Sequence, residues 1–181
     1  MPVSEKTFEQ LALEDDETTW ELVCGRLREK PRMSMEHNSV ARRLGFLLQS
    51  QLDWREYEVS VDAGYVRWTE ANYFGPDVFV IPAAYMERRR GQRGLETYDE
   101  PLPFVAEVWS PSTGGYDVDT KFPEYMARGD LEIWRVHPYE KSLTAWRRQA
   151  DGTYAESHYT SGVVHVESLP GVAIVLDRLF R

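Results

Sequence analysis

The sequence contains a single cysteine, Cys24, so no disulfide can form within the chain. The simplest interpretation is a reducing compartment and a small buried thiol. No apolar run approaches the roughly 20 residues that a membrane helix needs. The first residues, MPVSEKTFEQ, also lack the basic-then-apolar pattern of a signal peptide. We therefore expect a soluble, cytoplasmic protein with no membrane partner.

Positive charge is scarce as well. Lys and Arg number 21 against 30 Asp and Glu, which gives a formal net charge of −9. Nucleic-acid binding normally draws on a positive surface, so the balance has the wrong sign for such a partner. The arginines are nevertheless clustered, at 42–43, at 88–90 with 93, and at 147–148. A local basic rim is therefore available, although each cluster has the alternative reading of a solvated face.

The length and the apolar content favour one domain. The chain has 181 residues, of which 42% are hydrophobic and 13% aromatic, enough for a substantial core. No internal repeat, low-complexity tract or linker divides it. We therefore expect a single domain over residues 1–181.

The hydrophobic patterns predict a mixture of helices and strands. Helices are expected over 4–14, 36–54 and 117–128, and strands over 19–29 (a hairpin about Gly25), 57–68, 77–81, 103–109, 131–137, 142–148, 153–159 and 163–167. Residues 82–101 read as a polar connection. The β-α-β passage across 103–137 predicts that its two strands are parallel and adjacent. The expected fold class is α/β (α+β), with a mixed central sheet flanked by helices.

Two carboxylates interrupt strands that otherwise read as buried. Asp77 opens the apolar run DVFVI directly after Gly75-Pro76, and Glu107 lies inside PFVAEVW. An isolated buried charge is very costly, so each carboxylate must be paired, hydrogen-bonded or bound to a metal. A local polar network or an arginine partner would serve Glu107 equally well.

A lysine follows the second of these strands. The segment SPSTGG at 110–115 marks a turn, and Asp117 and Lys121 then stand four apart, on one face if the segment is helical. Pro123 removes a backbone hydrogen bond. The regular helix can therefore begin near Lys121 instead, with Asp117 in the approach turn or at a cap. Either way, Glu107 and Lys121 can converge at one point.

These stretches resemble the Uma2 family, formerly DUF820, whose members are described as candidate restriction endonucleases. The specific signal is EVWSPST from Glu107 with Asp117 and Lys121 downstream, together with GPDV ending at Val78. The resemblance extends over nearly the whole chain. Other similar stretches are WELV at 20–23 with Gly25, Glu36-His37, KFPEY at 121–125, EIW at 132–134, LPG at 169–171 and Leu179-Phe180.

The resemblance implies a PD-(D/E)XK nuclease with a restriction-endonuclease-like fold. Asp77 and Glu107 would be catalytic metal ligands, with the backbone carbonyl of Val108 completing the shell. Lys121 would be the motif's lysine, moved to the helix because Trp109 occupies its usual strand position. The implied cofactor is Mg²⁺ (or Mn²⁺), a hard cation that carboxylate oxygens suit. It would activate water and neutralise phosphate charge, while the lysine positions that water or stabilises the transition state.

Three accessory residues and two DNA contacts complete the prediction. Asp117, Glu21 and His37 could join the cluster, although Glu21 could equally be a paired surface glutamate and His37 a surface residue at a helix start. Arg42 and Arg43 are the predicted nucleic-acid-binding residues. We expect the carboxylates of the two strands to face each other, with the lysine amine pointing into the same cavity.

The leading functional hypothesis is a metal-dependent endonuclease that hydrolyses DNA phosphodiester bonds. One alternative is a non-catalytic nucleic-acid-binding or interaction module with the same fold, which the acidic balance keeps open. Another is a metal-dependent hydrolase of a small phosphate ester, for which an acidic exterior matters less. Because cutting both strands of a duplex usually calls for two active sites, we expect a homodimer.

Overall fold

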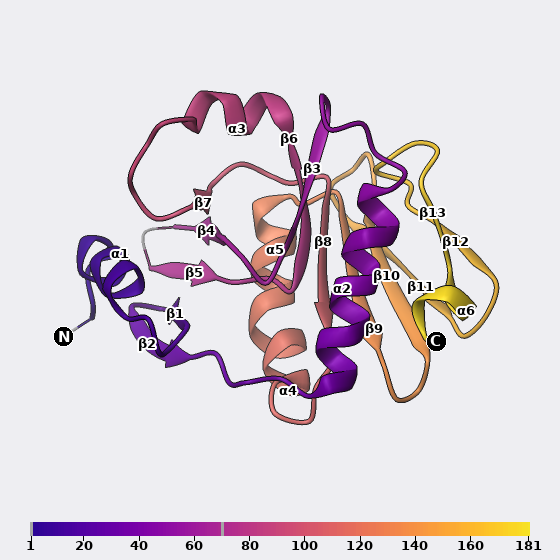
Figure 1. Ribbon diagram of the computed structural model, residues 1–181, viewed down its shortest axis with the longest axis horizontal. Coiled ribbons are helices and arrows are strands. Elements are labelled where there is room, and N and C mark those ends of the chain that lie inside the picture. Colours follow the sequence, from indigo (N-terminus) through magenta and orange to yellow (C-terminus); the bar gives the residue numbers. More distant parts are fainter. Residues whose placement is uncertain (1, 70) are drawn as a thin grey trace.

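Helices and strands alternate along the chain, as the sequence predicts (Figure 1). The computed structural model describes residues 2–69 and 71–181. The helices are α1 (Glu5–Glu14), α2 (Met35–Gln49), α3 (Ala83–Arg89), α4 (Gly114–Tyr116), the π-helical turn η1 (Asp117–Lys121), α5 (Phe122–Arg128) and α6 (Leu176–Leu179). The strands are β1 (Trp20–Val23), β2 (Arg26–Glu29), β3 (Tyr57–Val61), β4 (Tyr65–Trp68), β5 (Asn72–Phe74), β6 (Val78–Pro82), β7 (Thr97–Tyr98), β8 (Phe104–Val108), β9 (Glu132–His137), β10 (Ser142–Arg148), β11 (Tyr154–Tyr159), β12 (Val163–His165) and β13 (Ala173–Val175). None of these helices is long and apolar enough to cross a membrane.

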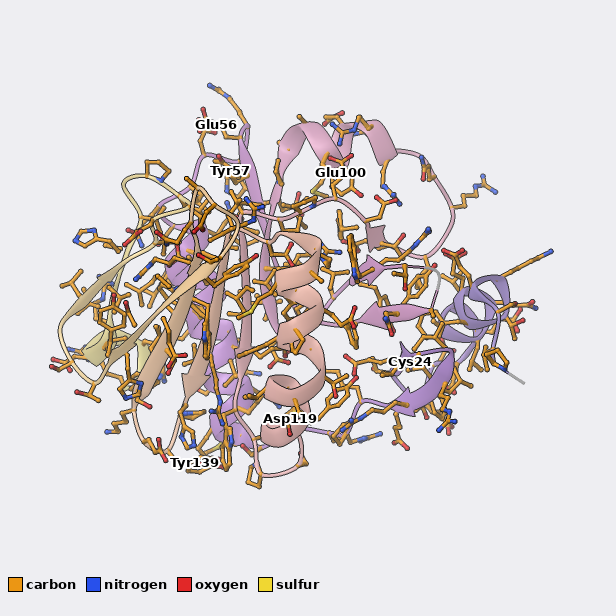
Figure 2. The ribbon with its side chains drawn as sticks, turned by 180° about the vertical axis from the view of Figure 1, so that it is seen from behind. Cys24, Glu56, Tyr57, Glu100, Asp119 and Tyr139 are labelled. Carbon is orange, nitrogen blue, oxygen red and sulfur yellow. The ribbon has the colours of Figure 1, made fainter. Side chains whose placement is uncertain are left out.

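A six-stranded mixed sheet, in the order β11-β10-β9-β8-β6-β3, forms the centre. Strands β8 and β9 are parallel neighbours, with Val105 opposite Ile133, so the predicted crossover is confirmed. Helix α2 lies in front of this sheet and α5 behind it in Figure 1, and the view from behind in Figure 2 agrees. A second, five-stranded sheet has the order β2-β1-β5-β4-β7. The predicted α+β fold with a helix-flanked mixed sheet is confirmed.

Alternate side chains of the central strands enter two different cores. One core joins α2 to one face of the sheet and includes Val78, Val80, Phe104, Ala106 and Val108. The other joins α5 to the opposite face and includes Phe79, Ile81, Val105, Phe122 and Tyr125. Successive strand residues point to opposite faces, so Glu107 shares the face of Val105. The alternation therefore directs the Glu107 carboxylate toward the helical segment that carries Lys121.

Three of the predicted elements differ from the structure. The strand expected over 57–68 is divided into β3 and β4, which belong to different sheets. The connection at 82–101 contains α3 and β7, because Tyr85 and Tyr98 are buried there despite the polar composition. The second helix ends at Gln49 rather than near residue 54. The side chain of Gln51 donates to the carbonyl of Leu47 at 2.7 Å and so caps the helix end.

The expected buried thiol is also wrong, because Cys24 is exposed (Figure 2). Cys24 and Gly25 form the two-residue turn between β1 and β2, with φ of 49° and 73°. Positive φ at both central residues is the hairpin geometry that matches the twist of the two strands. At this turn the side chain of Cys24 lies in solvent.

Candidate active site

Asp77 and Glu107 lie on neighbouring strands at the same end of the central sheet. Strands β6 and β8 are antiparallel, with Val78 opposite Ala106. One further step along this register places Asp77 opposite Glu107, and opposite residues project from the same face. The backbone N–H of Val108 also donates to Asp77 Oδ2 at 2.8 Å. The structure therefore brings together the two carboxylates that the sequence selected.

Lys121 is a buried cation among three carboxylates. Its Nζ lies 3.2 Å from Glu107 Oε1, 3.0 Å from Glu21 Oε1 and 3.6 Å from Asp117 Oδ1, and its side chain is only 3% exposed. Burial alone would lower the pKa of Lys121, but the charges of Glu107, Glu21 and Asp117 outweigh burial and raise it. The ammonium group therefore stays protonated within the cluster.

A π-helical turn places Asp117 beside Lys121. Helical conformation begins at Gly114, so Asp117 is inside the helical segment and not in an approach turn. The N–H of Phe122 bonds to the carbonyl of Asp117, five residues back. The change to α-helical bonding falls next to Pro123, which has no N–H to contribute to either pattern. Wide turns of this kind are frequent at functional sites.

Helix α4 requires a glycine at its first residue, Gly114. A Cβ at Gly114 would lie 2.0 Å from Trp109 Nε1, so a larger residue would overlap the indole. Trp109 in turn stacks on His137, with ring centroids 4.2 Å apart and an interplanar angle of 20°. The strand position two residues after Glu107 is thus filled by a packed aromatic ring, while Lys121 places its amine beside Glu107 from the helical segment.

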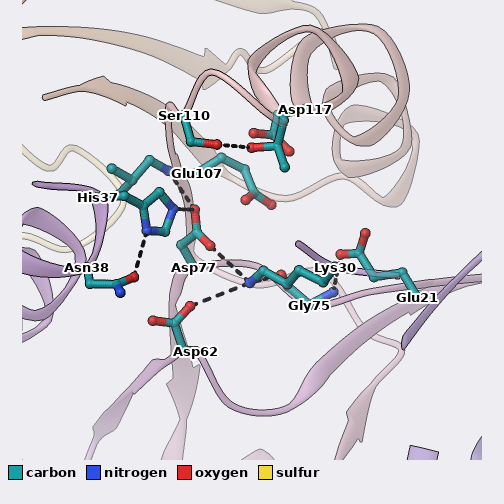
Figure 3. Close-up of polar contacts among 12 residues, drawn as sticks. Glu21, Lys30, His37, Asn38, Asp62, Gly75, Asp77, Glu107, Ser110 and Asp117 are labelled. Carbon is teal, nitrogen blue, oxygen red and sulfur yellow. Dashed lines mark hydrogen bonds and ion pairs between the residues drawn. The ribbon is translucent and has the colours of Figure 1, made fainter. Parts of the chain in front are cut away.

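Asp77 is held by two basic side chains (Figure 3). Its Oδ1 lies 3.0 Å from Lys30 Nζ and its Oδ2 lies 2.9 Å from His37 Nε2. Burial alone would raise the pKa of Asp77, but Lys30 and His37 outweigh burial and lower it. Burial would lower the pKa of His37, yet Asp77 and the Asn38 oxygen, 3.2 Å from Nδ1, raise it. Both pKa shifts favour the ionised forms of Asp77 and His37. The surface alternative for His37 is wrong because the side chain is fully buried.

Glu107 and Asp117 are less well compensated. Tyr125 donates its hydroxyl to Glu107 Oε1 at 2.5 Å, beside the contact with Lys121. Burial raises the pKa of Glu107 well above its ordinary value, and Lys121 offsets only part of this rise. Burial also raises the pKa of Asp117, whose Oδ1 is buried without a hydrogen-bond partner among residues 2–69 and 71–181. In this half of the cluster the carboxylates therefore outnumber the single cation, Lys121.

Glu21 reaches the cluster from the second sheet. Its Oε1 accepts from the N–H of Gly75 at 2.9 Å, and its Oε2 accepts from the hydroxyl of Tyr116 at 3.0 Å. The side chain is 1% exposed, so the alternative of a surface glutamate is wrong. Gly75 lies two residues before Asp77. The hydrogen bond from Gly75 to Glu21 therefore holds the backbone that positions Asp77.

The donor chemistry fits a hard divalent cation, but its shell is not preassembled. Buried carboxylates outnumber the basic side chains, as Glu21, Asp77, Glu107 and Asp117 face Lys30, His37 and Lys121. Such an excess of hard oxygen donors suits Mg²⁺ or Mn²⁺. In the described part of the chain, however, no group of three or more His, Cys, Asp or Glu is arranged to hold a metal. The contact that Val108 makes is through its N–H, and ligation by its carbonyl stays a prediction.

The predicted DNA contacts lie further along α2. Arg42 is exposed, whereas Arg43 donates from Nη1 to the carbonyl of Leu179 at 2.9 Å. Arg43 thus ties α2 to the C-terminal helix. Nucleic-acid binding by Arg42 and Arg43 stays a prediction.

Sequence reasoning missed Lys30 and Tyr125. Tyr125 stands four residues after Lys121, and that spacing indicates a shared helix face. Lys30 continues an alternation of basic residues through Arg28, which pairs across the hairpin with Glu21. That register indicates that Lys30 lies on the same side as the Glu21 carboxylate, so both signals were present in the sequence.

Comparisons with known proteins agree with this geometry. The family model Uma2, described as "Putative restriction endonuclease", matches residues 6–177. The structure resembles the crystal structure of "a putative nuclease belonging to DUF820" from Anabaena variabilis ATCC 29413, with a TM-score of 0.80 and 16% identity over 99% of this chain and 98% of that chain. At this identity the likeness shows a shared fold. A search of curated proteins found no match. Because the family model spans nearly the whole sequence, the chain belongs to the Uma2 family, and its assignment as a nuclease-family protein is confirmed.

Proposed function

We propose that this protein is a divalent-metal-dependent endonuclease that hydrolyses DNA phosphodiester bonds. The observation that supports this most is the convergence of Asp77, Glu107 and Lys121 in one buried cluster, with Lys121 Nζ 3.2 Å from Glu107 Oε1. Membership of the Uma2 family supports nuclease activity in general. The metal requirement and the DNA substrate are our proposal, and they rest on the residue types that converge.

The side chains divide the proposed work. Asp77 and Glu107 would hold Mg²⁺ or Mn²⁺, with Val108 and Asp117 as neighbouring oxygen donors. When bound, the metal would lower the pKa of a water molecule and neutralise charge on the phosphate. Lys121, held protonated by its carboxylate partners, donates to the attacking water or to the phosphate oxygen as charge develops there.

Glu21 and His37 act as positioning residues in this scheme. Glu21 accepts from Gly75 and pairs with Lys121, so it holds the lysine in line with Glu107. His37 donates to Asp77 and thereby orients that carboxylate. Loss of either side chain should disturb the geometry without removing a group that reacts.

A cleavage assay on plasmid and single-stranded DNA with Mg²⁺, Mn²⁺ or EDTA tests this function. We expect cleavage with either metal and none with EDTA. Equal rates for wild type and Lys121→Ala would assign the activity to another site or to a contaminant. DNA binding without cleavage would favour the non-catalytic module. Metal-dependent hydrolysis of p-nitrophenyl phosphate, with DNA left intact, would favour the small-ester hydrolase.

We also propose that the protein acts as a homodimer in the cytoplasm. Cutting both strands of a duplex calls for two active sites, and the chain supplies one candidate site. Light scattering coupled to size exclusion should give twice the chain mass. A monomer that linearises plasmid only through accumulated independent nicks would contradict the dimer.

A further inference from the structure

We propose that Lys30 is a built-in counter-ion of Asp77, and that a divalent cation can bind Asp77 only by displacing the Lys30 ammonium group. This inference rests on the metal site proposed above and adds a residue that the predicted site and the family description do not include. It makes metal binding an exchange of one cation for another on the same carboxylate oxygen.

Lys30 directly follows β2, the edge strand of the second sheet, and its ammonium group binds the Asp77 carboxylate (Figure 3). Its Nζ lies 3.0 Å from Asp77 Oδ1, 3.0 Å from the carbonyl oxygen of Gly75 and 3.5 Å from Asp62 Oδ1. The side chain is only 10% exposed. These three oxygens satisfy the three N–H donors of the Lys30 ammonium group.

The remaining oxygen of Asp77 is less accessible to a metal. Oδ2 accepts from His37 Nε2 at 2.9 Å and from the N–H of Val108 at 2.8 Å. The N–H belongs to the backbone of a central strand and cannot move without breaking the sheet. Lys30, by contrast, can leave through rotation of its own side-chain bonds. Oδ1 is therefore the oxygen at which exchange is feasible.

A second position for the displaced ammonium group lies next to the first. Lys30 lines a hollow of about 340 Å³ together with Asp62, Asn38, Glu29 and Glu17. The carboxylate of Asp62 is 43% exposed and already within 3.5 Å of Nζ. Side-chain rotation toward Asp62 would keep the lysine paired and free Oδ1. Lys30 thus has two acidic partners, one buried and one at the surface.

Isothermal titration with Mn²⁺ compares the wild type with Lys30→Met. Removing the Lys30 ammonium group should tighten Mn²⁺ binding about tenfold, because Asp77 Oδ1 is then available to the metal without a prior displacement. In EDTA the same variant should unfold at a lower temperature, since buried Asp77 loses one of its two basic partners. Should Lys30→Met fail to fold without metal, Lys30→Gln, which keeps a donor but no charge, takes its place in both measurements.

The matched control is Arg28→Met. Arg28 lies on the same face of the hairpin, with its guanidinium over the ring of Tyr116 and not on Asp77. Arg28→Met removes one positive charge near the site, as Lys30→Met does. Any gain in Mn²⁺ affinity that comes only from the lower positive charge will therefore appear in both variants. Asp62→Asn should weaken Mn²⁺ binding, because the displaced lysine then loses its second partner.

The outcomes separate the two proposals. Equal Mn²⁺ affinities for wild type, Lys30→Met and Arg28→Met would overturn the role of Lys30 and leave the metal site standing. An equal gain in both variants would overturn it as well, because the effect would be one of charge alone. Absence of Mn²⁺ binding in all variants would remove the metal site and the exchange with it.

Discussion

Two buried charge clusters lie at opposite ends of the α4-to-α5 segment, and they are built differently. At the C-terminal end, Arg128 and Asp130 are both buried and pair with each other, Nε lying 3.1 Å from Oδ2. The guanidinium also donates to the carbonyls of Arg67, Tyr98 and Glu100, and Asp130 accepts from the N–H of Leu102. The charges balance and the donors are used.

The cluster at the other end has neither property. It holds more carboxylates than basic groups, and Asp117 Oδ1 has no hydrogen-bond partner among the described residues. A carboxyl pKa raised by burial, by contrast, occurs at both ends, at Glu107 and at Asp130. Burial of charge is therefore common to both ends and does not itself indicate function. The imbalance distinguishes the candidate site, because a stability network has no reason to gather uncompensated like charges.

Breaking the balanced pair should have the largest effect on stability. Asp130→Ala leaves the guanidinium of Arg128 buried without a counter-charge, and we expect a loss of about 3–5 kcal/mol in the free energy of unfolding. Urea denaturation measures it. Asp119→Ala, on the exposed side of the π turn (Figure 2), is the control and should change stability by less than about 0.5 kcal/mol. If Asp130→Ala lowered the free energy of unfolding only slightly, the Arg128–Asp130 pair would not be the stabilising network that distinguishes it from the candidate site.

Removing the lysine of the unbalanced cluster should affect the reaction most. For Lys121→Ala we expect DNA cleavage to fall by about 10²–10³-fold or more, while Mn²⁺ binding persists, because the amine is not a ligand. Asp77→Ala and Glu107→Ala should lose both. Cleavage rates and calorimetric titration separate the three variants. Circular dichroism checks that each is folded. Loss of Mn²⁺ binding in Lys121→Ala would make the lysine structural, like Arg128.

Mn²⁺ should stabilise the folded protein by binding at the candidate site and not at the Arg128–Asp130 pair. At a free Mn²⁺ concentration of about 100 times the dissociation constant, the free energy of unfolding should rise by about 2.7 kcal/mol. Thermal unfolding with Mn²⁺ and with EDTA measures the gain in wild type, in Asp77→Ala and in Asp130→Asn. The gain should vanish in the first variant and survive in the second. A wild-type melting temperature indifferent to Mg²⁺ and Mn²⁺ would leave the carboxylates as an ion-pair network.

The metal-free protein should lose stability as pH rises. Burial raises the pKa of Glu107 above its ordinary 4.5, so the folded state holds a proton that the unfolded state releases. The contribution of Glu107 to stability is then fully present below pH 4.5 and is lost as pH rises through the raised pKa, by at most about 1.4 kcal/mol per pH unit for one proton. His37, raised above 6.5, adds a loss in the same direction at higher pH.

Urea denaturation in EDTA between about pH 5 and about pH 8 tests this dependence. Glu107→Gln should flatten the decline, because the amide cannot titrate and keeps an acceptor for the hydroxyl of Tyr125. A stability that rises with pH in wild type would show that Glu107 is ionised and fully compensated by Lys121. In that case the two buried clusters would be alike.

The smallest effect concerns DNA affinity. Arg42→Ala should reduce the slope of log affinity against log salt by about one, the change expected from one lost phosphate contact. Arg43→Ala should in addition lower stability slightly, since its guanidinium binds the carbonyl of Leu179. Filter binding at several salt concentrations measures the slope. An unchanged slope for Arg42→Ala would place the DNA path elsewhere.

The sequence predicted the unbalanced cluster better than its surroundings. Asp77 and Glu107 were found because each interrupts an apolar strand, and Lys121 because it follows a glycine-rich turn. Lys30 was missed because its contact with Asp77 spans 47 residues and depends on how the second sheet meets the first. Local patterns report which face a side chain uses. They do not report which distant segment covers that face.

The short elements were missed for a related reason. Strand β7 has two residues, too few for an alternation to be visible, and its pairing with Tyr65 and Val66 is set by the tertiary fold. The buried ring of Tyr85 fixes α3 through a hydroxyl bonded to Asp99. Single anchoring aromatics of this kind carry no periodic signal. Composition therefore suggested a loop.

The π turn at Asp117–Lys121 has a consequence for recognising related chains. A π turn is equivalent to an α-helix that has gained one residue, and each residue of an α-helix advances the chain by about 100°. A relative with an unbroken helix would need its lysine one position nearer the strand to reach the same carboxylate. Motif searches that demand the spacing between Glu107 and Lys121 seen here will overlook such chains, whereas searches that tolerate one deletion between them will recover both forms.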